Sequence, residues 1–344
     1  MKLYIASTSE YSGKTLIALA LGKIWGDAGV KVGYLKILGK IPVSENGRMA
    51  DEDATFIARE LSLQGPPEAF CPVVITPDLV MAAYRNEELN LRERIAAAVR
   101  DAEARSEILL IGGTANARDG YFFGLSPVEL IRDFDCRVVL VDKFEGEKSM
   151  DQVLWAAHVL GPRLLGVVFN RVAPEQESFV RGTVTAFLES RGIRVLGGVP
   201  VDPLLDSVSV GSLITTLHAA VLVEGASLGT MDVEHALRIF RGIPRKAVIT
   251  GGGRMDIQLA ALETDTVCLV LTGGISPHEI ILARAREKGV AVLNVREDTF
   301  STVERFERIL GRLRIREPEK VARGVETVRA SVDTDGLLAL CRKP

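Results

Sequence analysis

Short runs of apolar residues alternate with amphipathic helical patterns from residue 1 to about residue 200. Each apolar run has about five residues rich in Val, Ile and Leu, which is typical of strands buried on both faces. The predicted strands are Leu3–Ala6, Lys31–Leu35, Ile108–Ile111, Arg137–Val141, Leu165–Phe169 and Arg194–Gly198. The helical patterns between them are Lys14–Ala28, Glu52–Leu61, Leu89–Ala104, Pro127–Phe134, Met150–Leu160 and Glu175–Arg191.

The repeated order of strand and helix predicts an α/β fold with a mostly parallel sheet covered on both faces. Right-handed crossovers would make the sheet doubly wound, with ligands at the carboxyl ends of its strands. The stretch 199–203 contains two prolines and interrupts the alternation. We therefore predict that the first domain comprises residues 1–205.

A second, smaller α/β domain is predicted for residues 206–315. Its expected strands are Lys246–Thr250, Val267–Leu271 and Ala291–Val295. Its expected helices are Val233–Phe240, Met255–Leu262, Pro277–Lys288 and Thr302–Leu310. Residues 316–344 form a C-terminal tail in which we expect one helix, about Pro318–Val332.

Composition narrows the classes of function. The chain has 344 residues, 47% of them hydrophobic and 25% charged, and a net charge of −3, so a general nucleic-acid surface is not indicated. We expect no membrane segment, because no apolar run approaches the length of about 20 residues that a spanning helix needs. The N-terminal apolar run is also too short for a secretory signal. The four cysteines are far apart in the sequence, which favours buried thiols in a reducing cytoplasm over disulfides.

The stretch Ser7-Thr8-Ser9-Glu10-Tyr11-Ser12-Gly13-Lys14-Thr15 carries the candidate chemistry. It stands between the first predicted strand and the first predicted helix, where a phosphate-binding P-loop lies. Backbone N–H groups at a helix N-terminus attract an anion, Lys14 adds a positive charge, and the Thr15 hydroxyl can ligate Mg²⁺. The usual glycine five residues before Gly13 is Thr8 here. The alternative is a Ser-rich turn that only caps a helix.

This loop resembles the modified P-loop of dethiobiotin synthetase and the cobyrinic acid a,c-diamide synthase group. In that spacing Ser7 replaces the first glycine, Thr8 matches a threonine, and Gly13-Lys14-Thr15 match directly. It is similar also to the dethiobiotin-synthetase-like N-terminal part of long phosphate acetyltransferases. The resemblance implies a fold of the P-loop NTPase type that binds ATP or ADP with Mg²⁺, through Thr8, Ser12, Gly13, Lys14 and Thr15.

The same resemblance implies roles for further residues at strand ends. Lys36 would lie near the phosphates, Asp53 (with Asp51 second) would hold Mg²⁺ with Thr15, and Asn170 would contact adenine. The alternative interpretations without a ligand are, in the same order, a solvated lysine, acidic residues at the start of a helix and an asparagine in a turn. Gly112 stands where the relatives have a Mg²⁺-binding Glu, so one hard oxygen ligand is missing. Asp142, after the predicted strand Arg137–Val141, is either a Walker-B-like acid or an ordinary aspartate at the start of a loop.

The second domain resembles the DRTGG domain that follows the synthetase-like part of long phosphate acetyltransferases. The resemblance rests on 249–257, 271–274, 292–293 and 298–302, with Gly253 in place of the usual Asp. Glycine turns between strands and helices can accept an anion, or can simply make tight turns. Candidate ligand-binding residues are Gly252, Arg254, Asp256, Thr272, Gly273 and Gly274. The likeness ends near residue 310, and the acetyl-transferring domain is expected to be absent.

Three functions remain open from the sequence. The first is a cytoplasmic regulatory or sensor protein that binds an adenine nucleotide with weak or no hydrolysis. The second is an ATP-dependent carboxylate-activating ligase related to dethiobiotin synthetase. The third is an assembly protein with a vestigial P-loop, acting through a protein partner. By analogy with this P-loop group we expect a homo-oligomer.

Overall fold

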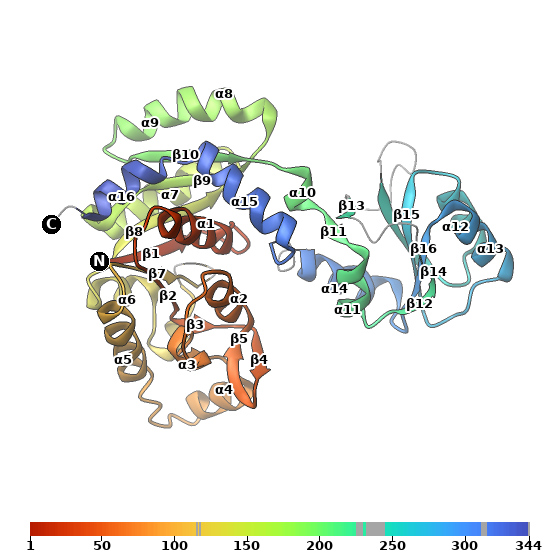
Figure 1. Ribbon diagram of the computed structural model, residues 1–344, viewed down its shortest axis with the longest axis horizontal. Helices are drawn as coiled ribbons and strands as arrows, with labels where there is room; N and C mark the ends of the chain where they lie inside the picture. Colours follow the sequence, from red (N-terminus) through yellow and green to blue (C-terminus); the bar gives the residue numbers. More distant parts are fainter. Residues whose placement is uncertain (115, 117, 225–229, 232–244, 311–314, 343–344) are drawn as a thin grey trace. The chain divides into compact units, whose positions relative to one another are not determined.

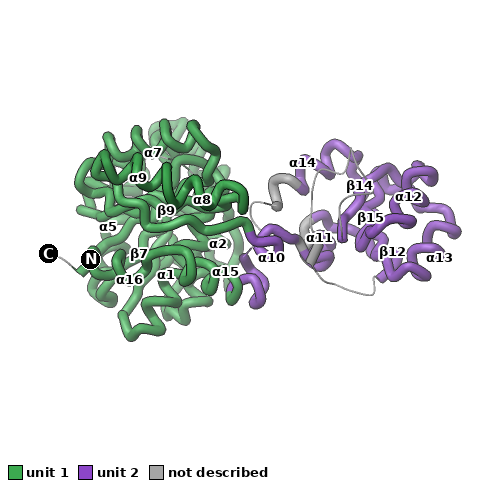
Figure 2. Tube along the Cα trace, turned by 90° about the horizontal axis from the view of Figure 1, so that it is seen from above, with its two compact units in different colours: residues 1–201, 322–344 green, residues 202–321 purple. Residues whose placement is uncertain are grey.

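The computed structural model describes residues 1–114, 116, 118–224, 230–231, 245–310 and 315–342 of the chain. They form two compact units, the first made of residues 1–201 and 322–344 and the second of residues 202–321 (Figure 2). The boundary that was predicted near residue 205 therefore falls between residues 201 and 202. The residues predicted as a separate tail belong largely to the first unit.

The first unit is built on a six-stranded sheet in which all neighbouring strands are parallel. Its order is β10-β9-β8-β1-β7-β2, which places the first strand inside the sheet (Figure 1). The strands are β1 (Lys2–Ser7), β2 (Val32–Lys36), β7 (Ile108–Gly112), β8 (Arg137–Lys143), β9 (Leu164–Val172) and β10 (Val195–Pro200). The predicted doubly wound, mostly parallel sheet is confirmed, with small shifts at the strand ends.

The connections reverse direction at the middle of this sheet. Helix α1 (Lys14–Asp27) leads from β1 past β7 to β2, whereas the chain then returns through β7 to β8, β9 and β10. Since the crossovers are right-handed, α1 covers one face, and α5 (Leu91–Ala104), α6 (Pro127–Asp133) and α7 (Glu147–Leu160) cover the other. The point of reversal lies between β1 and β8, where doubly wound sheets bind their ligands.

Several short elements were not predicted. Between β2 and β7 the chain forms β3 (Leu38–Gly39), β4 (Pro42–Glu45), β5 (Arg48–Asp51), α2 (Glu52–Glu60), α3 (Pro67–Phe70), β6 (Val73–Val74) and α4 (Pro77–Tyr84), of which only α2 was expected. The helix predicted over 175–191 is interrupted. It consists of α8 (Glu177–Phe179), a π-helical turn over Val180–Val184 and α9 (Thr185–Glu189).

The C-terminal residues form two helices, α15 (Pro318–Ser331) and α16 (Thr334–Arg342), where one was expected. Helix α16 packs beside α1, and the Trp25 indole N–H donates to the Thr334 carbonyl at 3.1 Å. Between the two helices, Val332 forms an antiparallel bridge with Gly197 of β10. The tail thus extends the layer that α1 forms over the sheet (Figure 1).

The second unit contains a four-stranded sheet of order β12-β16-β15-β14. β14 (Lys246–Gly251), β15 (Thr266–Thr272) and β16 (Ala291–Asn294) are parallel, and β12 (Ala220–Val223) is antiparallel to β16. Helices α11 (Val210–Leu217), α12 (Met255–Leu262), α13 (Glu279–Lys288) and α14 (Thr299–Leu310) accompany it, with a short α10 (Pro203–Asp206) and the strand pair β11 (Val208–Ser209) and β13 (Thr230–Met231). The predicted smaller α/β domain is confirmed, and the helix expected at Val233–Phe240 lies outside the described residues.

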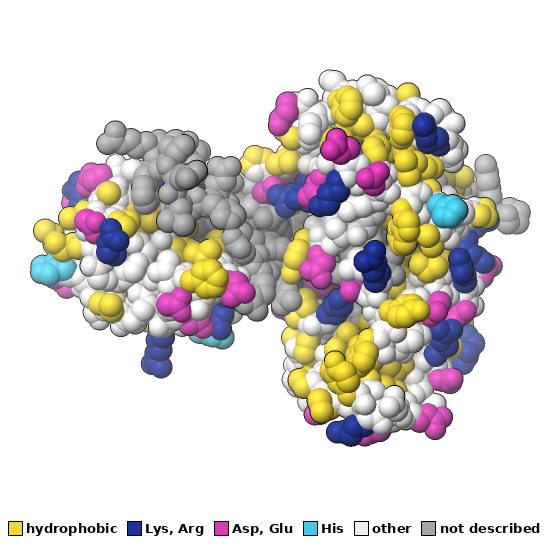
Figure 3. All heavy atoms as spheres, turned by 180° about the vertical axis from the view of Figure 1, so that it is seen from behind, with side chains coloured by type: hydrophobic (Ala, Val, Ile, Leu, Met, Phe, Trp, Pro, Cys, Tyr) yellow, Lys and Arg dark blue, Asp and Glu magenta, His cyan; other side chains and the backbone are white. Residues whose placement is uncertain are grey.

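None of the helices in the described ranges is both long enough and apolar enough to cross a membrane. Figure 3 shows one face of the surface, on which Lys and Arg side chains are interspersed with Asp and Glu. This mixture agrees with the net charge of −3.

We predict that Gly197→Ala destabilises the first unit by about 2 kcal/mol or more, because its φ of 149° suits only glycine and a Cβ would lie 2.0 Å from the Ser331 carbonyl oxygen. Urea unfolding followed by circular dichroism measures the change. The adjacent Gly198→Ala is the control, since a Cβ there would make an ordinary contact of 3.4 Å with Val172. Equal effects of the two substitutions would contradict the account.

Candidate functional site

The predicted phosphate-binding loop joins the end of β1 to the start of α1. Gly13 precedes α1 in a left-handed conformation, with φ 98°. A Cβ at Gly13 would lie 2.0 Å from the side-chain nitrogen of Asn170 at the end of β9. Both the conformation and this close approach require glycine, so the Gly of the Gly-Lys-Thr sequence is fixed by the fold as well as by any ligand.

The loop is closed by its own hydroxyl groups. The Lys14 ammonium donates to the Ser7 hydroxyl at 2.6 Å, and the Ser12 hydroxyl donates to the Ser9 carbonyl at 2.7 Å. The Asn170 amide donates to the Ser12 carbonyl at 2.9 Å. Asn170, predicted as an adenine contact, thus holds the loop in this structure. Its contact with a base stays a prediction.

A second tie fixes the start of the loop. The Thr8 hydroxyl donates to a carboxylate oxygen of Asp142, which is fully buried at the end of β8. Burial raises the pKa of Asp142, and the hydroxyls of Ser149 and Thr8 partly offset this effect. Asp142 therefore positions Thr8. The sequence left open whether it was a replacement acid or a loop residue, and the structure gives it this positioning role.

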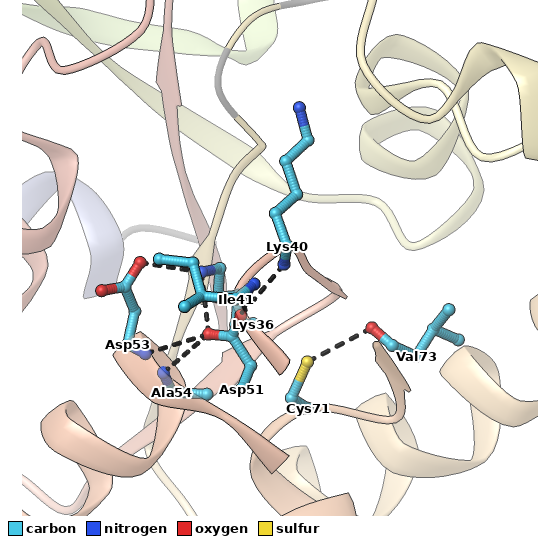
Figure 4. Close-up of polar contacts among 8 residues, drawn as sticks. All are labelled: Lys36, Lys40, Ile41, Asp51, Asp53, Ala54, Cys71 and Val73. Atoms are coloured by element: carbon cyan, nitrogen blue, oxygen red, sulfur yellow. Dashed lines mark hydrogen bonds and ion pairs between the residues drawn. The ribbon is translucent and has the colours of Figure 1, made fainter. Parts of the chain in front are cut away.

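Three charged side chains, Lys36, Asp51 and Asp53, form a compact cluster (Figure 4). The Lys36 ammonium at the end of β2 lies 2.8 Å from a carboxylate oxygen of Asp51 and 2.9 Å from one of Asp53. Burial alone would lower the pKa of Lys36, but Asp53 and Asp51 outweigh it and raise the pKa. Lys36 is thus held firmly in its charged form.

The two carboxylates of this cluster have different surroundings. Asp51 is fully buried and caps α2, and its oxygens accept from the backbone N–H groups of Lys40, Ile41, Asp53 and Ala54. Asp53 keeps 23% of its side chain exposed. Asp51 is consequently a structural residue, and Asp53 is the better placed of the two to meet a cation.

The electrostatics of Lys14 reflect this crowding. Desolvation by the surrounding protein, followed by the positive charge of Lys36, lowers the pKa of Lys14 to about 8. Asp119, Asp53 and Glu10 act in the opposite direction. Lys14 is therefore still mostly charged at neutral pH, and an anion bound beside it would raise its pKa.

The sequence reasoning missed Asp119. It lies in the segment after β7, and its carboxylate pairs with the Lys40 ammonium at 2.7 Å. Its negative charge also reaches Lys14. No motif marks Asp119. Its one signal in the sequence is an acidic residue in the segment that follows a strand, and the carboxyl end of that strand lies near the point where the connections reverse.

Gly112 ends β7, where the relatives were expected to carry a Mg²⁺-binding Glu. A Cβ at Gly112 would lie 2.5 Å from the Tyr34 hydroxyl oxygen of the neighbouring strand β2. Tyr34 is buried, and burial raises the pKa of its hydroxyl well above the usual value. The uncharged Tyr34 ring fills the space that a longer side chain at position 112 would need. The packing between β7 and β2 therefore leaves no room for a carboxylate at this position.

The second-unit candidates do gather at the carboxyl ends of β14 and β15. The backbone N–H groups of Gly252, Gly273 and Gly274 are used by the protein, donating to the carbonyls of Thr272, Glu297 and Val295. Gly273 and Gly274 have positive φ, and a Cβ at Gly252 would lie 2.5 Å from the Ile275 carbonyl oxygen. Tight turns therefore account for these glycines.

The polar candidates of the second unit also pair with each other. Arg254 and Asp256 form an exposed ion pair at 3.0 Å, and the hydroxyls of Thr272 and Thr299 lie 2.6 Å apart. In the described part of the chain, no group of three or more His, Cys, Asp or Glu side chains could hold a metal ion. A ligand at this edge stays a prediction.

Comparison with known proteins defines the class. A family model described as an AAA domain matches residues 1–209, and one described as a DRTGG domain matches residues 208–309. The first match covers more than half of the chain, which therefore belongs to this AAA-domain family of P-loop proteins and continues into a DRTGG domain. The predicted resemblance to a dethiobiotin-synthetase-like domain followed by a DRTGG domain is confirmed.

Among individual relatives, phosphate acetyltransferase of Pseudomonas aeruginosa is 24% identical over 374 residues, which cover 99% of this chain and 52% of that protein. The dethiobiotin synthetase of Methanococcus vannielii is 26% identical over 202 residues, 57% of this chain and 91% of that protein. A solved nucleotide-binding protein from Archaeoglobus fulgidus in complex with ADP is 15% identical, covers 58% of this chain and 82% of its own, and has a TM-score of 0.33. The chain spans about half the length of the phosphate acetyltransferases that it matches.

We predict that Gly112→Ala lowers the melting temperature, because its Cβ would collide with the Tyr34 hydroxyl. In a Tyr34→Phe background the nearest remaining ring atom lies at 3.2 Å, so the cost should fall by about 1 kcal/mol. Gly113→Ala is the control, since its Cβ would meet the Ile5 backbone oxygen at 2.5 Å and Tyr34→Phe cannot relieve that contact. Strictly additive effects of Gly112→Ala and Tyr34→Phe would show that this contact is not the constraint.

Proposed function

We propose that this chain binds ATP or ADP at the loop 7–15 and acts as a cytoplasmic regulatory or sensor protein with weak or no hydrolysis. The observation that carries the proposal is the geometry of this loop, in which Gly13 precedes α1 with φ 98° and Lys14 stands in the first turn of the helix, its ammonium 2.6 Å from the Ser7 hydroxyl. A phosphate group there would meet the Lys14 ammonium and the backbone N–H groups at the N-terminus of α1. The pre-closed loop would bind it at little ordering cost.

The contacts of the nucleotide follow from this placement. Lys14 would contact the β- and γ-phosphates, with Thr8, Ser12 and Gly13 forming the loop around them. Lys36 would balance charge near the phosphates while it stays paired with Asp51 and Asp53. Because the Asn170 amide already donates to Ser12, contact with adenine would use its carbonyl oxygen or its second amide hydrogen.

The residues present fit a Mg²⁺ ion held mainly by the nucleotide. The Thr15 hydroxyl stands in the first turn of α1, and the partly exposed Asp53 carboxylate can supply one further oxygen. Mg²⁺ is commonly bound by one or two carboxylates with phosphates and water, so this set suffices for binding. The Gly112 position adds no oxygen, which favours binding over efficient phosphoryl transfer.

The tail supports a regulatory role. Helix α1 begins at the loop and contacts α16, and its last turn carries Asp27, which pairs with Arg329 of α15 at 3.0 Å. The chain enters the second unit after β10 and returns to the first through α15. Nucleotide at one end of α1 could therefore alter the segment through which the second unit is attached, and thereby bias a ligand of Gly252–Gly274 or a protein partner. We extend the proposal to a homo-oligomer.

The alternative is an ATP-dependent ligase related to dethiobiotin synthetase. The match to the Methanococcus vannielii enzyme over 91% of its length favours it, and the closed Gly112 position disfavours it. Release of phosphate in the presence of small carboxylic acids would support the ligase. Loss of all nucleotide binding would instead favour an assembly protein with a vestigial P-loop.

We predict that Lys14→Ala weakens ATP and ADP binding by about 10- to 100-fold, the equivalent of about 1.5–3 kcal/mol for a charge-assisted hydrogen bond. Calorimetric titrations with ATP, ADP and GTP, each with and without Mg²⁺, measure the affinity. Lys23→Ala is the matched control, because Lys23 lies on the same helix and pairs with Glu60 at 2.9 Å, away from the loop. Unchanged affinity in Lys14→Ala would refute the assignment.

A further inference from the structure

An apolar patch lies on the surface of the first unit, where α4 meets the 3₁₀ turn Tyr121–Phe123. Helix α4 lies at the lower edge of this unit in Figure 1. It has a single charged residue, Asp78, yet none of its residues is buried. Met81 and Tyr84 stand about one helical turn apart, on the same side of α4. The Tyr84 ring packs against that of Phe122, with 4.9 Å between the ring centroids, so the helix and the turn share one surface.

The fold holds the exposed side chains of this surface in defined positions. Leu79 and Phe123 pack against the hydrophobic core, which anchors α4 and the turn. Gly120 and Gly124 flank the turn with φ of 87° and 66°, and a Cβ at Gly120 would lie 2.6 Å from the Leu125 carbonyl oxygen. The rings next to these anchors therefore need little further ordering to make a contact, which favours binding of a partner.

The exposed area of the patch is sufficient for a contact between two copies of the chain. We define the patch by four residues that are exposed by 52%, 68%, 72% and 53%, namely Met81, Tyr84, Tyr121 and Phe122. At about 200 Å² for a fully exposed residue of this size, they present about 500 Å² of surface. Pairing with the same patch of a second copy buries about 1,000 Å² in all, which reaches the lower limit of about 1,000 Å² for a specific interface.

Charges of both signs stand at the edges of the patch. After α4, Arg85 pairs with Glu87 at 2.6 Å, and at least half of each side chain is exposed. Beside the turn, Arg92 pairs with Glu129 at 3.2 Å and donates to the Gly124 carbonyl. A membrane surface would favour a rim of basic residues alone. A rim that carries both signs complements itself in a twofold-symmetric pair, because each arginine can face a glutamate of the other copy.

We propose that two copies of this chain pair through the patch in an isologous contact. The rings of Tyr84 and Phe122 lie at its centre, and the charged side chains of the rim close around them, so both copies bury the same apolar surface. This contact rests on the homo-oligomer proposed above and identifies its surface, but it does not require a bound nucleotide.

Sedimentation equilibrium of the full chain without nucleotide, over about 1–200 μM, measures the association. We expect the mass to rise with concentration from 37.3 kDa toward twice that value. Phe122→Glu places a charge in the contact of each copy and should raise the dissociation constant of the dimer by about 100-fold or more. Phe179→Glu is the matched control, because Phe179 is 51% exposed on α8 of the same unit, outside the patch, and should leave the constant unchanged.

Exchange of charges at the rim tests the twofold symmetry. Arg85→Glu alone and Glu87→Arg alone each bring like charges together across the contact and should raise the dissociation constant by about three- to tenfold. The double substitution should restore it, because every arginine again faces a glutamate. A double variant as weak as the single ones would contradict the isologous arrangement.

The remaining outcomes separate the surface from the oligomer, provided that circular dichroism shows each variant to be folded. A dimer that Phe122→Glu does not weaken would overturn the assignment of the patch and leave the homo-oligomer standing. A mass of one chain at every concentration would overturn both, whereas nucleotide binding is tested separately by Lys14→Ala. Sedimentation of a monomeric protein with phosphatidylcholine vesicles would show that a lipid surface covers the patch instead of a second copy.

Discussion

The approach of Asn170 to Gly13 is the contact on which the site depends. It joins the end of β9 to the start of α1, closes the loop through the Ser12 carbonyl, and admits no side chain at position 13. The closed loop in turn holds the Lys14 ammonium 2.6 Å from the Ser7 hydroxyl, where desolvation and then the charge of Lys36 lower its pKa. A preformed loop with a lysine at a helix N-terminus is the arrangement that favours an anion in physical terms, whatever the anion is.

On the other side of the loop, the acidic side chains differ from those that the resemblance implies. Tyr34 fills the position from which a carboxylate would extend at Gly112, and Asp51 is committed to capping α2. Of the two aspartates that pair with Lys36, Asp53 is the better placed to meet a cation. The loop therefore has more groups that suit a phosphate than carboxylates that suit a metal ion. For this reason we favour nucleotide sensing over catalysis.

The sequence predicted what depends on local spacing. The parallel strands, the position of the loop between β1 and α1, and the second α/β domain followed from runs of apolar residues and from Gly13-Lys14-Thr15. Long-range contacts could not be predicted in this way. The residues around Gly112 do not indicate that Tyr34 packs against it, and those around Gly197 do not indicate that the C-terminal tail returns to pair with it. Asp119 acts on Lys14 only because the fold brings the two together. The hydrogen bonds that Asp51 and Asn170 make to the backbone could not be predicted from the sequence either.

The uptake of protons on ADP binding tests the central claim most directly. If the pKa of Lys14 is about 8 in the free protein, a bound phosphate raises it, and binding at pH 8 takes up about half a proton. Calorimetry in two buffers of different ionisation enthalpy measures this number. We predict uptake at pH 8 that declines as the pH falls toward 7, below which the ADP phosphate adds proton release of its own, and affinity that falls as the pH rises above 8. Binding at pH 8 without proton uptake, or with proton release, would contradict the account.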